Sequence, residues 1–72
     1  MNTAKLKGRM KENGITQEVL AAMIGISLST LNRKITNEDG DSFTIKEANA
    51  IFKALNLSPD DAVAIFFADN VA

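Results

Sequence analysis

The chain contains no cysteine, histidine, tryptophan or tyrosine, and it has a single proline among 72 residues. Without cysteine there is no disulfide, no zinc–thiolate site and no thiol nucleophile. Without histidine the commonest general base and metal ligand is missing as well. The sequence also has no phosphate-binding glycine motif. We therefore expect no enzymatic activity, no cofactor, no metal and no small-molecule ligand.

The chain also lacks a long apolar run. No stretch approaches the ~18 residues of a transmembrane helix, and the N-terminus lacks the apolar core of a signal peptide. A chain of 72 residues with 46% hydrophobic and 24% charged residues is typical of one soluble globular domain. We expect a single domain over residues 1–72, located in the cytoplasm and without a membrane partner.

The two signs of charge nearly balance overall, with eight Lys and Arg against nine Asp and Glu. The two signs are segregated, however. Residues 1–35 have a net charge of +4, whereas residues 36–72 have a net charge of −5. The average of −1 argues against a nucleic-acid partner, which usually meets a basic surface. The asymmetry points to a partner for the N-terminal half only, with chance segregation as the alternative.

Capping residues and hydrophobic spacing predict an all-α fold of short helices. We expect helices near residues 3–12, 17–24, 28–35, 45–55 and 59–67. Their predicted N-caps are Asn2 or Thr3, Thr16, Ser27, Thr44 and Ser58. Thr44 with Glu47 forms a capping box, and Pro59 suits a first helical position. Residues 36–42 are polar and acidic and are expected to form a loop.

Apolar residues spaced three or four apart predict which helix faces form the core of a compact five-helix bundle. The expected core residues are Leu6, Met10, Leu20, Leu31, Ile35, Ile45, Ala48, Ile51, Phe52, Leu55, Ala62, Ile65 and Phe66. Val19 and Met23 form another apolar pair, which we interpret as peripheral core. Val63 and Phe67 lie on a second face of the last helix.

Residues 16–35 contain the most specific pattern in the chain. Two short helices are joined by a tight turn at Gly25, and Ala21 is small where the helices would cross. This is the arrangement of a helix-turn-helix, whose second helix fits the DNA major groove of about 12 Å width. A simple corner between two bundle helices is the alternative.

At these residues the sequence resembles the phage repressor and Cro-like helix-turn-helix family. The matching residues are Thr16-Gln17, Leu20-Ala21, Ile24-Gly25-Ile26-Ser27, Leu31 and Asn32-Arg33. The resemblance extends over nearly the whole chain and implies a five-helix, lambda-repressor-like domain. It further implies a sequence-specific regulator of transcription, of phage or prophage type, that binds operator DNA as a homodimer.

The resemblance assigns base contacts to the outward face of the third helix. With Leu31 and Ile35 pointing inward, that face carries Leu28, Ser29, Asn32 and Arg33. Arg33 suits guanine and Asn32 suits adenine, whereas Leu28 offers only apolar contact. A partly exposed packing residue is the alternative for Leu28, and a solvated charge is the alternative for Arg33.

Phosphate contacts are expected around the motif, because helix N-termini and polar side chains there position the protein on DNA. The expected phosphate contacts are Arg9, Thr16, Gln17, Thr30, Lys34, Asn37, Ser42, Phe43 and Thr44. Lys5, Lys7 and Lys11 are interpreted as solvating the first helix. The acidic residues 38–41 depart from the family, because Lys or Arg is common in that loop of relatives; they would repel a phosphate backbone.

A homodimer requires an exposed apolar face. Val63, Ile65, Phe67 and Val71 are the expected dimer interface. The alternative is that the first helix covers this face.

A second functional hypothesis is a protein-interaction module, antirepressor-like or antitoxin-like, that keeps the fold without strong DNA binding. The acidic C-terminal half motivates it.

Overall fold

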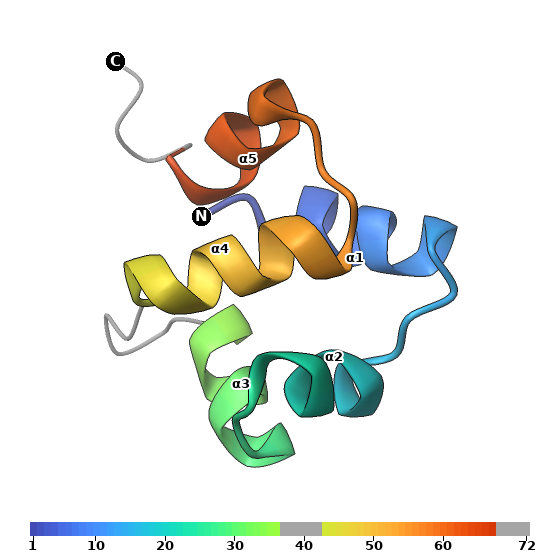
Figure 1. The fold of residues 1–72 in the computed structure, drawn as a ribbon, viewed down its shortest axis with the longest axis vertical. Helices are drawn as coiled ribbons and strands as arrows, with labels where there is room; N and C mark the ends of the chain where they lie inside the picture. Colours follow the sequence, from blue (N-terminus) through green and yellow to red (C-terminus); the bar gives the residue numbers. More distant parts are fainter. Residues whose placement is uncertain (37–42, 68–72) are drawn as a thin grey trace.

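A computed structural model describes residues 1–36 and 43–67, and these residues form an all-helical domain (Figure 1). The helices are α1 (Thr3–Glu12), α2 (Gln17–Ile24), α3 (Leu28–Thr36), α4 (Ile45–Ala54) and α5 (Pro59–Phe66). No strand occurs in this described part of the chain. The fold class and the helix positions predicted from the sequence are confirmed.

Local capping explains where each helix begins. In every case a side-chain oxygen accepts a hydrogen bond from a backbone N–H three residues on, which would otherwise have no partner. The capping oxygens belong to Asn2, Thr16, Ser27, Thr44 and Ser58, with N···O distances of 3.1–3.2 Å. At α4 the capping box is complete, because the Thr44 N–H donates to Glu47 Oε1 at 2.9 Å.

The turn between α2 and α3 depends on Gly25. Its backbone is left-handed, with φ 79° and ψ 30°, a conformation that side chains with a Cβ disfavour. The N–H groups of Gly25 and Ile26 both donate to the Ala21 carbonyl, at 2.9 and 3.0 Å. These bonds close the C-terminal end of α2 and set the direction in which the chain enters α3.

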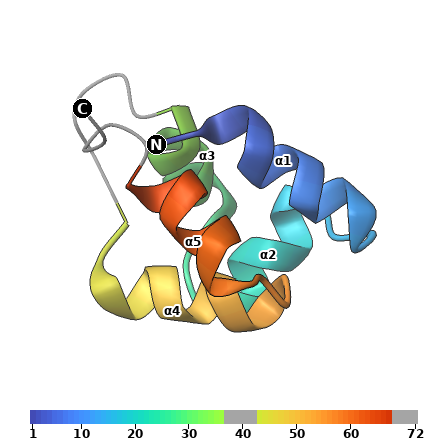
Figure 2. The same cartoon turned by 90° about the horizontal axis from the view of Figure 1, so that it is seen from above.

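One hydrophobic core joins all five helices. Its fully or nearly buried residues are Leu6, Met10, Leu20, Ala21, Leu31, Ile35, Ile51, Leu55, Leu57 and Ile65. Helix α2 packs against α3 and α4, while α1 packs against α5. Figure 2 shows α5 crossing the molecule with α1 on one side and α4 on the other.

Two hydrogen bonds connect the N-terminal segment to the helices of this core. The Asn2 N–H donates to the Ile65 carbonyl at 2.8 Å, which joins the chain start to α5. The Thr3 hydroxyl donates to the Ile35 carbonyl at 3.1 Å and so satisfies an acceptor near the end of α3. Helix α3 is therefore held at its C-terminal end by α1.

Three expectations about apolar residues are wrong. Ile45, predicted to face the core, is 84% exposed at the start of α4. Val19 and Met23, predicted as peripheral core, are 46% and 52% exposed. The spacing of apolar residues along one helix does not show how much of that helix a neighbouring helix covers.

Candidate nucleic-acid interface

Helix α3 turns one face inward and the other outward. Leu31 and Ile35 are 0% and 1% exposed, which fixes the rotation of the helix about its axis. The four predicted base-contacting residues, Leu28, Ser29, Asn32 and Arg33, are all exposed, Leu28 as the first residue of the helix. The predicted solvent-facing surface of the second motif helix is therefore present.

Hydroxyl groups gather where this face begins. The Ser27 hydroxyl donates to Thr30 Oγ1 at 2.8 Å and lies 3.3 Å from Ser29 Oγ. Leu28, between them, is 41% exposed. The N-terminal turn of α3 thus presents polar groups and one apolar side chain, which suits contact with base edges and a thymine methyl.

The predicted phosphate contacts at the start of α2 lie at the surface. Thr16 is exposed and caps the helix, and Gln17 is half-buried in its first turn. Helix N-termini attract anions, because unpaired N–H groups and the helix dipole point outward there. Thr30, another predicted contact, is half-buried.

The predicted second phosphate clamp is described only in part. Asn37, Ser42 and the acidic residues 38–41 lie outside the described residues. Phe43 is half-buried, with its ring edge-on to Phe66 at 6.1 Å between centroids. The Thr44 N–H already donates to Glu47, so this group has a partner within the protein.

Lys34, predicted to contact phosphate, is instead paired within the domain. Its Nζ lies 2.7 Å from Glu47 Oε1, and the two side chains are only 13% and 15% exposed. The hydrogen bond from Lys34 lowers the pKa of Glu47, and bonds from Thr44 add to this, while partial burial acts in the opposite direction. The ion pair connects α3 to the start of α4.

Arg9, also predicted to contact phosphate, is paired as well. Its guanidinium lies 2.8 Å from Glu12 and 3.1 Å from Asp61, and Lys5 Nζ lies 3.6 Å from the same Asp61 oxygen. The hydrogen bond from Arg9 lowers the pKa of Asp61, and the same contacts raise the pKa of Arg9. These charges connect α1 to α5, a role that sequence reasoning missed because 52 residues separate Arg9 from Asp61.

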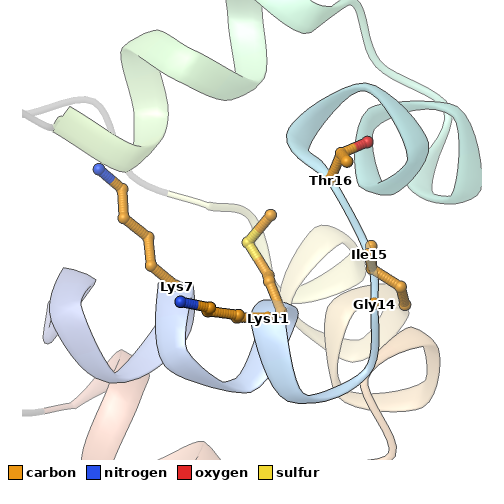
Figure 3. Close-up of a pocket in the computed structure, with 6 residues that line it drawn as sticks. Lys7, Lys11, Gly14, Ile15 and Thr16 are labelled. Atoms are coloured by element: carbon orange, nitrogen blue, oxygen red, sulfur yellow. The ribbon is translucent and has the colours of Figure 1, made fainter.

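A shallow pocket of about 390 Å³ lies beside the start of α2 (Figure 3). It is lined by Lys7, Met10, Lys11, Gly14, Ile15 and Thr16. Lys7 and Lys11 were predicted only to solvate the first helix. Their spacing of four residues, just before the Asn13-Gly14 turn, is the signal that could have placed them next to Thr16.

The predicted dimer face is exposed at two of its four positions. Val63 and Phe67 are 52% and 54% exposed, so α1 does not cover them. Ile65 has no exposed surface and belongs to the core, so its assignment to an interface is wrong. Val71 lies outside the described residues.

Two helices joined by a left-handed glycine turn, with the second helix exposed along one polar face, define a helix-turn-helix protein. Residues 5–67 match the model of the Cro/C1-type HTH DNA-binding domain, and the chain belongs to that family. No curated protein and no solved structure matches the chain. Among the described residues no helix is long and apolar enough to cross a membrane.

Proposed function

We propose that this DNA-binding domain is a sequence-specific regulator of transcription, of phage-repressor or Cro type, that acts as a homodimer on an operator. The observation that carries the proposal is the exposed face of α3. Ser29, Asn32 and Arg33 share that face, with Leu28 exposed at its N-terminal end, whereas Leu31 and Ile35 are buried in the core. Nothing in the stability of a bundle requires Ser29, Asn32 and Arg33 together on an exposed face.

Chemistry assigns each outward residue a role in the major groove. Arg33 offers two N–H donors to guanine O6 and N7, and Asn32 pairs with adenine N6 and N7. Leu28 meets a thymine methyl, and Ser29 donates or accepts at either base type. Thr16 and Gln17 hold a phosphate at the start of α2 and so fix the register of α3.

The test is a fluorescence-anisotropy titration against duplexes selected from a randomised pool, repeated over a salt series. The Arg33→Ala variant is expected to lose about 1–3 kcal/mol of binding energy, concentrated at one base pair. Lys53→Ala, which removes an exposed charge from α4, is the matched control and should bind like the wild type. Absent or salt-independent binding would contradict the proposal.

The dimer is supported by Val63 and Phe67, two exposed apolar residues four positions apart on one face at the end of α5. Two copies related by a two-fold axis would read half-sites about 34–36 Å apart. Sedimentation velocity should show that Val63→Glu weakens self-association. Ile45→Glu places the same charge at another exposed apolar position and should leave it unchanged. Equal behaviour of the two variants would refute this interface.

A second candidate function, a protein-interaction module, is favoured by one observation. Val19 and Met23 expose apolar surface on α2, and Met23 lines a hollow of about 380 Å³ with Ala50, Lys53 and Ala54. Heparin resin separates the two functions, because a phosphate-binding surface is retained at low salt. Elution in the void volume at low salt would favour the interaction module.

A further inference from the structure

Five of the six basic residues in residues 1–35, all except Arg33 on the DNA-facing side proposed for α3, divide into two groups. Lys5, Arg9 and Lys34 each face a carboxylate within 4 Å. Lys7 and Lys11 form no ion pair with any carboxylate in residues 1–36 or 43–67, and both are exposed. Arg9 and Lys34, which the sequence favoured as phosphate contacts, are therefore paired within the domain, whereas Lys7 and Lys11 on α1 face no carboxylate of the described residues.

These two lysines lie beside the helix-turn-helix. They are four residues apart on α1, so their side chains leave the same face of the helix about 5–6 Å apart at Cβ. Both line the shallow pocket that Thr16, at the start of α2, also lines. Figure 3 shows the two lysines on one side of this pocket and residues 14–16 on the other.

We propose that Lys7 and Lys11 bind the phosphate backbone of DNA beside the start of α2, and so extend the DNA interface onto α1. The inference rests on the proposed function. A lysine ammonium is a compact point charge suited to phosphate, and its long stem reaches outward from a helix. The adjacent Met10 and Ile15 carry no charge that would compete for the ammonium groups. Lys34 and Arg9 are held by carboxylates and contribute less.

The test compares the Lys7→Gln/Lys11→Gln variant with the wild type on a duplex of random sequence over a potassium chloride series. Glutamine keeps a long helix-forming side chain and removes the charge. Removing one lysine–phosphate interaction reduces the slope of log affinity against log salt by about 1, so the slope should fall by about 2. Between 50 and 200 mM salt, wild-type affinity would then drop about 16-fold more than that of the variant.

Two controls make the result specific. The Lys7→Arg/Lys11→Arg variant keeps both charges and should keep the wild-type slope. Lys53→Gln removes one charge from the far end of α4 and should also leave the slope unchanged. Circular dichroism checks that each variant folds.

The outcomes separate this inference from the proposed function. If the wild type binds DNA and loses specificity in Arg33→Ala, but the double glutamine variant keeps the wild-type slope, Lys7 and Lys11 only solvate α1 and the inference is overturned. Phosphate contacts carry no sequence information, so the ratio of affinities for selected and random duplexes should not change. A changed ratio would also overturn it. If the wild type binds no duplex, the proposed function fails first and this inference with it.

Discussion

The ion pair between Lys34 and Glu47 connects α3 to the start of α4, and its contribution to the free energy of unfolding follows from its distance and burial. Exposed pairs contribute about 0.2–1 kcal/mol, whereas breaking a buried pair costs about 3–5 kcal/mol. With Nζ and Oε1 2.7 Å apart and side chains 13% and 15% exposed, this pair lies between those limits. We expect a coupling energy of about 1–2 kcal/mol.

A double-mutant cycle isolates that energy. Glu47→Gln removes the charge but retains an oxygen that can accept from the Thr44 N–H, because glutamine also serves in a capping box. Lys34→Met removes the other charge and keeps a long apolar stem. Urea unfolding followed by far-UV circular dichroism gives the free energy of unfolding of the wild type, both single variants and the double variant.

Each single variant is expected to lose stability, and the double variant should lose less than the sum. For a domain of this size each kcal/mol lowers the melting temperature by about 4–8 °C. Additivity of the two substitutions within about 0.3–0.5 kcal/mol would refute the reasoning. Lys34→Met should also lower the DNA salt slope less than the Lys7 and Lys11 substitutions do, since Glu47 already holds the Lys34 ammonium.

Further predictions concern the core, the turn and acid. Leu31→Ala should destabilise by about 2–5 kcal/mol in urea unfolding, because a fully buried side chain leaves a cavity; a cost below about 1 kcal/mol would show that the site collapses. Gly25→Ala should cost about 1–2 kcal/mol by the same assay. An added Cβ there meets no atom within 4 Å, so the cost comes from the left-handed backbone alone. Contacts to Arg9 and Lys34 hold the pKa values of Asp61 and Glu47 below their usual range. Their stabilising contribution is complete above the unfolded pKa of about 4 and is lost as pH falls through the lower folded values. Urea midpoints measured from neutral pH downward should decline in that window, and less in Glu47→Gln.

Much of the fold follows from the sequence because its determinants are local. A cap is decided by a side chain and an N–H three residues away, so Thr16, Thr44 and Ser58 mark helix starts correctly. The helix-turn-helix is equally local, since Gly25 ends one helix and buried Leu31 orients the next. The outward face of α3 could therefore be named before any tertiary structure was known.

What only the tertiary structure decided is which residues meet across helices. The last helix carries apolar residues on two faces, and packing against α1 and the core, not spacing, buried Ile65 and left Val63 and Phe67 exposed. The same holds for charge. Sequence alone determined that six of the eight Lys and Arg belong to the half of the chain with the motif. A lysine is neutralised, however, only where packing brings a carboxylate within about 4 Å. Packing brought Glu47 to Lys34 and brought no carboxylate of the described residues that close to Lys7 or Lys11.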